Sequence, residues 1–258
     1  MPAAERILEV VDLVKNYGHR GSVTLALRGV TLAVDRGEFV GVMGPSGSGK
    51  TTLLNVISTI DAPTSGRVWI GGREVTALPR RELARFRRER LGFIFQDFNL
   101  LDTLTLRENI GLALSIAGAP AREIDRRVVA MARRLGIEDA LDRFPYQVSG
   151  GQKQRAAAAR ALITEPDLVL ADEPTGNLDS NSARALLVAL AGLNEELQAT
   201  ILLVTHDPVA ASYCRRILFI KDGRLFFELV RGDAPRQRFF DRIIGVLAEL
   251  GGDSADGR

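Results

Sequence analysis

The chain has 258 residues, of which 46% are apolar and 26% charged, and its formal net charge is +2. This composition is ordinary for a soluble globular protein, and the length suffices for one large α/β domain with a substantial core. Basic residues are spread from Arg6 to Arg258 and do not gather in one block. Charge alone therefore does not nominate nucleic acid as a partner, and we expect none.

Cysteine content and apolar run length bear on where the chain works. Cys214 is the single cysteine, so it cannot form an intramolecular disulfide, and no charged-then-apolar leader precedes Val10. Both features predict a reducing, cytoplasmic location. The longest apolar runs, such as residues 201–204, hold only a few residues, whereas a membrane-spanning helix needs about 20. If the chain acts at a membrane, another chain must span it.

Short apolar segments and helical segments alternate along the chain. Residues 7–13 and 23–34 read as antiparallel strands interrupted by a turn at Tyr17-Gly18, and should form a side sheet. Four apolar runs bounded by Gly, Asp or Thr predict buried strands of a mainly parallel sheet over residues 39–43, 168–171, 201–204 and 217–220. Apolar residues at helical spacing predict helices over residues 50–57, 150–163 and 183–197. This alternation indicates an α/β fold.

Strand signals fade from about residue 98 to residue 146, where Ala- and Arg-rich stretches such as residues 123–135 favour helices. We therefore expect a helical subdomain, about residues 98–163, inserted in a single domain that spans residues 1–250. The low complexity of residues 251–258 predicts a disordered tail.

A glycine-rich stretch links the first buried strand to a helix, as a phosphate-binding loop requires. Backbone amides can wrap phosphate oxygens there, the helix dipole attracts negative charge, and side chains larger than glycine would block the approach. The lysine would reach the terminal phosphates, and the hydroxyl after it would bind Mg2+. A plain Gly-rich turn is the alternative, but the chain has only four lysines. The loop consists of Gly44, Pro45, Ser46, Gly47, Ser48, Gly49, Lys50 and Thr51.

Two carboxylates follow the apolar run at residues 168–171, at the strand end where open α/β sheets bind ligands. Asp172 would hold Mg2+, and Glu173 would polarise the attacking water as general base. The alternative is that acidic residues merely end a strand at the solvent. His206 follows a neighbouring parallel strand at the same sheet edge, from where it can hydrogen-bond the γ-phosphate and the attacking water. His19 lacks such a context and reads as a surface residue.

Ser149, Gly150, Gly151 and Gln152 begin an Ala-rich helix, where a serine N-cap and two glycines expose amides at the positive helix end. This is a second candidate anion site. One chain cannot easily direct two helix N-termini at one triphosphate from opposite sides, so this helix should complete the site of a partner subunit. A plain capped helix start is the alternative.

Taken in order, these motifs resemble ABC ATPase cassettes over nearly the whole chain. The resemblance implies a P-loop NTPase fold with a RecA-like core, ATP and Mg2+ as cofactors, and a homodimer attached to a membrane permease. It also implies that Tyr17 stacks on adenine and Thr52 contributes to the nucleotide site, and that Gln96 touches Mg2+ or water while sensing the permease. Asp179 would report across the dimer. Val148 stands where the family commonly has leucine.

Longer stretches indicate a branch of this family. Residues 173–180 are similar to macrolide exporters, lipoprotein-releasing ATPases and a cell-division ATPase. Residues 98–106, Tyr146-Gln147 and Phe239-Phe240 most resemble bacitracin- and lantibiotic-resistance transporters. That resemblance implies two copies on one large permease, often working with a sensor histidine kinase. Lipoprotein release, macrolide export and cell-division coupling remain alternatives, whereas DNA-repair and translation ATPases need long coiled-coil insertions or two cassettes.

Two weaker signals concern the surface. Phe98, Leu100 and Leu101 form either the apolar rim that receives a permease helix or ordinary core. Near the C-terminus, Phe239, Phe240, Ile243, Ile244 and Leu247 share one helix side, and we expect that side to pack on its own domain.

Overall fold

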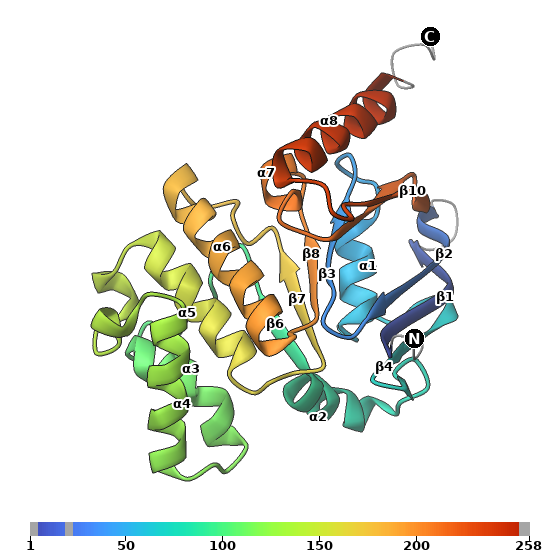
Figure 1. Cartoon of the computed structure of the whole chain (residues 1–258). Helices are drawn as coiled ribbons and strands as arrows, with labels where there is room; N and C mark the ends of the chain where they lie inside the picture. The colour runs from blue at the N-terminus through green and yellow to red at the C-terminus, as the bar shows by residue number, and fades with distance from the viewer. Residues whose placement is uncertain (1–4, 19–22, 253–258) are drawn as a thin grey trace.

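A computed structural model describes residues 5–18 and 23–252 of the chain (Figure 1). His19 and residues 253–258 of the expected tail lie outside the described residues. The helices are α1 (Lys50–Ile57), α2 (Arg80–Arg90), α3 (Leu106–Ile116), α4 (Ala121–Arg134), α5 (Gly150–Leu162), α6 (Ser180–Leu197), α7 (Pro208–Ala211) and α8 (Arg236–Gly252), with 3-10 turns η1 (Glu138–Ala140) and η2 (Pro145–Gln147).

The central sheet has six strands in the order β10-β9-β3-β8-β7-β6. All neighbours are parallel except β10, which pairs antiparallel with β9. Its strands are β3 (Phe39–Met43), β6 (Leu91–Ile94), β7 (Leu168–Asp172), β8 (Ile201–Val204), β9 (Arg216–Lys221) and β10 (Arg224–Val230). Strands β3 and β8 are buried along their whole length, as continuous apolar runs in a parallel sheet should be. The α/β prediction is confirmed.

A second, antiparallel sheet packs beside the first, as the N-terminal pattern predicts. Its order is β2-β1-β4-β5, with β1 (Arg6–Tyr17), β2 (Thr24–Asp35), β4 (Ser65–Ile70) and β5 (Arg73–Glu74). Both faces of the N-terminal half of β1 are partly buried, and Leu8 and Val10 contribute to a core shared with Val40 and Val42 of β3. Helix α1 lies between the two sheets (Figure 1).

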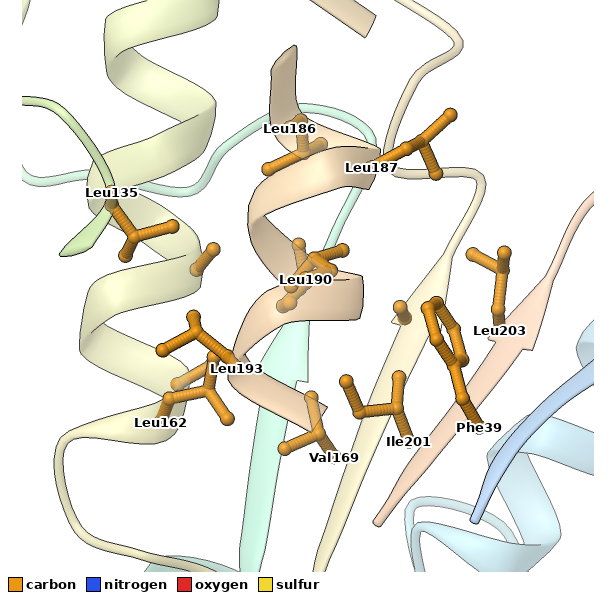
Figure 2. Packing of buried hydrophobic residues seen from close by; sticks show 14 of the residues in the cluster. Phe39, Leu135, Leu162, Val169, Leu186, Leu187, Leu190, Leu193, Ile201 and Leu203 are labelled. Atoms are coloured by element: carbon orange, nitrogen blue, oxygen red, sulfur yellow. The ribbon is translucent and has the colours of Figure 1, made fainter. Parts of the chain in front are cut away.

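Helices α3, α4, α5 and α6 lie to one side of the central sheet, where α5 packs against both β6 and α6 (Figure 1). A single apolar cluster joins these layers, and Figure 2 shows Leu162 of α5 and Leu190 of α6 facing Val169 of β7. The same cluster continues across the sheet to Phe39 of β3. Helix α5, which begins at residues 149–151, thus shares a core with β7, the strand that leads to the two carboxylates.

The C-terminal helix α8 packs on the domain, but not all the residues expected to face the domain are buried. Phe239, Ile243 and Leu250 are buried, whereas Ile244 is 41% exposed. Leu250 is buried near the end of the helix, which runs through Gly252, so the helix includes the first two residues of the tail expected over residues 251–258; the disorder of that tail stays a prediction. Within the described ranges, no helix is long and apolar enough to cross a membrane.

Candidate functional site

Gly44 and Gly49 of the phosphate loop are required by the strands around it. A Cβ on Gly44 would lie 2.0 Å from the carbonyl oxygen of Ile220, and one on Gly49 would lie 2.5 Å from that of Ala26. Gly49 also has a φ of 103° at the N-cap of α1, where no side chain caps the helix. The first amides of α1 are therefore left for a ligand, and an anion is the ligand that a helix N-terminus favours.

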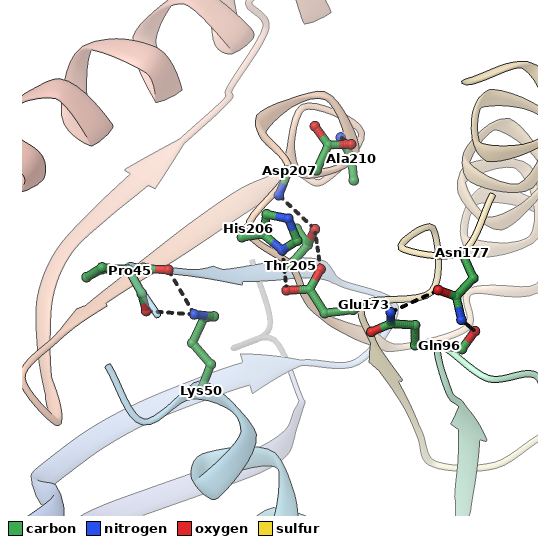
Figure 3. Close-up of polar contacts among 10 residues, drawn as sticks. Pro45, Lys50, Gln96, Glu173, Asn177, Thr205, His206, Asp207 and Ala210 are labelled. Carbon is green, nitrogen blue, oxygen red and sulfur yellow. Dashed lines mark hydrogen bonds and ion pairs between the residues drawn. The ribbon is translucent and has the colours of Figure 1, made fainter. Parts of the chain in front are cut away.

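Lys50 points back into this loop (Figure 3). Its Nζ donates hydrogen bonds to the carbonyl oxygens of Gly44 at 2.8 Å and Pro45 at 2.9 Å. Burial lowers the pKa of Lys50, while the charges of Glu173 and Asp172 act in the opposite direction. A buried ammonium that donates these two hydrogen bonds to neutral carbonyl oxygens fits an anionic ligand such as a polyphosphate.

The two carboxylates stand at the end of β7, beside the loop. Burial, followed by the charge of Glu173, raises the pKa of Asp172, and Lys50 offsets this in part. A carboxylate that burial and a like charge disfavour gains from a bound cation, so the donor set fits Mg2+. Glu173 has a φ of 45°, an uncommon backbone conformation for a residue with a side chain.

Both oxygens of the Glu173 carboxylate have partners from the loop after β8 (Figure 3). Nδ1 of His206 lies 2.8 Å from Oε1, and the buried hydroxyl of Thr205 donates to Oε2 at 3.2 Å. The Thr205 hydroxyl in turn accepts a hydrogen bond from the Asp207 amide at 3.0 Å. Thr205 was missed by sequence reasoning, although its place directly before His206 at a strand end is a readable signal.

The loop, Glu173 and His206 line one cavity of about 550 Å³. This size is within the range of pockets that hold small-molecule ligands. Leu247 and Leu250 of α8 form part of the wall, which the sequence did not indicate. The full lining is Gly44, Pro45, Ser46, Gly47, Lys50, Thr51, Glu173, His206, Leu247 and Leu250. The structure therefore brings together the phosphate loop and the two groups expected to act on water.

Gln96 lies next to this site, and its side chain hydrogen-bonds to another residue of the chain. Its Nε2 donates to Oδ1 of Asn177 at 3.1 Å, and Nδ2 of Asn177 donates back to the Gln96 carbonyl at 3.3 Å. A Cβ on Gly176 would lie 3.0 Å from the Gln96 side chain. Gln96 is thus coupled to the segment that follows Glu173, and Asn177 is a further residue that the sequence motifs did not single out.

The remaining candidate residues do not line the cavity. Ser149 caps α5 through a reciprocal pair of hydrogen bonds with Gln152, at 3.2 and 3.1 Å. Asp179 caps α6 by accepting from the amides of Asn181 and Ser182, each at 3.0 Å. Hydrogen bonds from Ser182 hold the pKa of Asp179 below its usual value. Both helix starts are therefore capped by side chains of the same chain and need no ligand in the phosphate cavity.

Tyr17 and Thr52 also lie outside the cavity lining. The Tyr17 ring is 41% exposed, its hydroxyl donates to Oδ2 of Asp61 at 2.8 Å, and Lys15 lies 4.8 Å from the ring centre. Burial and the hydrogen bond with Asp61 raise the pKa of Tyr17. One ring face is therefore taken by a cation, and any flat ligand would have to stack on the other.

Known proteins are similar to this chain over most of its length. The sequence profile of the family described as ABC transporter matches residues 27–176. The bacitracin export ATP-binding protein BceA of Halalkalibacterium halodurans is 53% identical over 97% of this chain and 99% of its own length. The uncharacterized ABC transporter ATP-binding protein YvcR of Bacillus subtilis is 56% identical over 96% of each. A solved dimeric ATP-binding cassette in a post-hydrolysis state with ADP and Pi is 39% identical, with a TM-score of 0.78 over 86% of this chain and 98% of that one.

Proposed function

The chain belongs to the ABC transporter family, and we propose that the transporter it serves exports antimicrobial peptides of the bacitracin and lantibiotic type. It is an ATP-binding subunit that hydrolyses ATP to drive transport. The observation that carries the peptide assignment is the match to a bacitracin export ATP-binding protein over 97% of this chain and 99% of that protein. Because that match takes in nearly the whole chain, it is not confined to motifs that all such ATPases share.

We assign the roles of the site residues as follows. Lys50 and the amides of residues 44–51 bind the phosphates of ATP, and Glu173 acts as the general base on the attacking water, with His206 beside it. Thr51, Asp172 and Gln96 would hold Mg2+, which when bound neutralises phosphate charge. Their fit rests on the half-buried Asp172, whose charge is disfavoured by burial and by Glu173 and is offset only in part by Lys50. Thr52 and Tyr17 would contact the rest of the nucleotide, with adenine on the free face of the Tyr17 ring.

A second copy of the chain is part of this proposal. The N-terminus of α5, with Ser149, Gly150, Gly151 and Gln152, does not line its own phosphate cavity. Its capped first turn nevertheless exposes amides suited to an anion. We propose that these residues cover the ATP of a partner subunit, and that Asp179 lies at the same interface. The dimeric state of the similar solved cassette with ADP and Pi supports a dimer of this chain.

The permease would dock beside Gln96. An apolar groove of about 440 Å³ runs between α2, β6, α3 and α5, and Phe93, Phe95, Leu112 and Ile116 are among its lining residues. Ile116 is 57% exposed at this groove, and a contiguous exposed apolar surface is typical of a site for a protein partner. We propose that the helical subdomain, about residues 98–163, forms one wall of this permease site and that the permease holds the chain at the inner face of the membrane. A link to a sensor histidine kinase stays a prediction of the sequence.

Growth inhibition by bacitracin and several lantibiotics tests the proposal in the native host. The gene is compared intact and with Lys50→Ala at matched expression, because that change removes the ammonium from the phosphate loop. Selective sensitisation to these peptides is the expected result. An unchanged response across the panel would leave the ATPase in place and refute the peptide substrate, which would favour lipoprotein release, macrolide export or division coupling.

A further inference from the structure

Helix α5 holds the segment that contains Gln96 at two separate points. The first is Gln154, which is completely buried. Its Nε2 donates to the carbonyl oxygen of Phe95 at 2.9 Å and to that of Pro174 at 2.7 Å. One side-chain amide thus joins α5 to the residue before Gln96 and to the residue after Glu173.

The second point is Arg160, two turns further along α5. Its guanidinium donates to the carbonyl oxygen of Asn99 at 2.6 Å and to that of Phe98 at 3.1 Å. Phe98 and Asn99 both have positive φ, at 60° and 50°, so this turn is unfavourable for residues with side chains. The charged fork of Arg160 stabilises its carbonyls, and burial lowers the pKa of Arg160. We name residues 95–99 the Gln96 segment.

These contacts are poorly explained by packing alone. Oε1 of Gln154 is buried and has no hydrogen-bond partner among the described residues. An apolar side chain of the same size would fill this space without leaving a polar atom unsatisfied, so what the amide adds is the two bonds it donates. Arg160 likewise gives up hydration to bind two backbone carbonyls of a strained turn.

We propose that Gln154 and Arg160 are positioning residues that make α5 and the Gln96 segment move as one body. A displacement of the segment by the permease is then carried along α5 to residues 149–151, which cover the partner's ATP. Gln154 extends the same link to Pro174 and so to the strand end that carries Glu173. The inference rests on the proposed permease site beside Gln96 and adds the residues that transmit its movement.

The first test measures backbone hydrogen exchange in the isolated chain. Gln154→Met keeps the side-chain length without donors, Arg160→Met removes the guanidinium, and Arg160→Lys keeps the charge but not the two-pronged donor. We expect faster exchange in the Gln96 segment for all three variants. The control is Arg133→Met on α4, whose guanidinium pairs with Glu138 at the surface, and it should leave the segment unchanged.

The second test compares the ATPase rate of the isolated chain with that of its complex with the permease in lipid nanodiscs. The Arg160 variants should keep basal rates near wild type, and the stimulation of each variant by the permease, taken relative to its own basal rate, should fall by about 2- to 30-fold. Arg133→Met should be stimulated like wild type. Full stimulation in Gln154→Met and in both Arg160 variants would overturn the proposal, whatever the exchange rates are.

Added bacitracin separates this inference from the proposed substrate. If the wild-type complex is stimulated by the permease but not by bacitracin, the peptide assignment is contradicted, and the variants still decide the role of Gln154 and Arg160. If both forms of stimulation are present in wild type and permease stimulation is lost only in the variants, both proposals are supported.

Discussion

The two glycines at the start of α5 should respond in opposite ways to alanine. A Cβ on Gly150 would meet only Phe98 at 3.7 Å and Leu178 at 3.8 Å, which are ordinary contacts. A Cβ on Gly151 would lie 2.6 Å from Oγ of Ser182, so either helix α6 or the Ser182 side chain must shift. The chain itself therefore requires glycine at position 151 and not at position 150.

The magnitudes follow from these distances. Alanine is favoured over glycine in a helix by about 0.5–1 kcal/mol, so Gly150→Ala should keep or slightly raise the melting temperature. Overpacking costs about 1–3 kcal/mol, so Gly151→Ala should have a net cost of about 1–2 kcal/mol. For a chain of this size that cost lowers the melting temperature by roughly 2–8 °C.

Gly150→Ala should lower the ATPase activity without lowering the stability. If Gly150 lies against the partner's phosphates, a methyl group there holds the amides away from them, and ATPase activity should fall by at least about a hundredfold. Thermal melts and steady-state ATP hydrolysis on the same preparations measure both quantities. A Gly150→Ala chain that is as stable and as active as wild type would refute the reasoning, because the glycine would then serve neither fold nor phosphate.

Three further predictions concern single side chains. Glu173→Gln should retain ATP affinity but accumulate as an ATP-bound dimer on size-exclusion chromatography; rapid turnover would remove Glu173 from the role of base. Asp172→Asn should raise the melting temperature of the nucleotide-free chain at pH 7, because burial and Glu173 disfavour the charge, and should weaken Mg-ATP binding. Burial raises the pKa of the Cys214 thiol, so iodoacetamide at pH 8 should label it only after unfolding, and labelling of the native chain would contradict its burial.

The parallel strands were predictable from sequence because burial on both faces leaves continuous apolar runs. Strand β6 was not predicted, because it has only four residues and one of them is Gly92, which weakens the strand pattern. A Cβ on Gly92 would lie 2.3 Å from the carbonyl oxygen of Ala161, so the glycine is required by the close approach of α5. Strand β10 escaped because it is an edge strand with most of its residues exposed.

The candidate site divides in the same way. The phosphate loop, Asp172 and Glu173 could be found because each depends on neighbours in sequence and on a strand end. Thr205 could have been suspected from its place before His206 at a strand end, but its contact with Glu173 depends on the pairing of β7 with β8. Asn177 could not be found, because the pairing of β6 with β7 brings it to Gln96. Nothing in the sequence of α8 indicates that Leu250 reaches the phosphate cavity, since that depends on how the helix crosses the domain.

The start of α5 and the start of α6 form one unit. Ser182 fills the space beside Gly151, and its amide also donates to Asp179, the cap of α6. Asp179 and Gly151 are 28 positions apart in sequence, yet both contact the same serine. If residues 149–151 cover the partner's ATP, Asp179 is brought to that interface by the same contact. A change in one nucleotide site would then reach the other through two helix starts that cannot move independently, because the space between them is already filled.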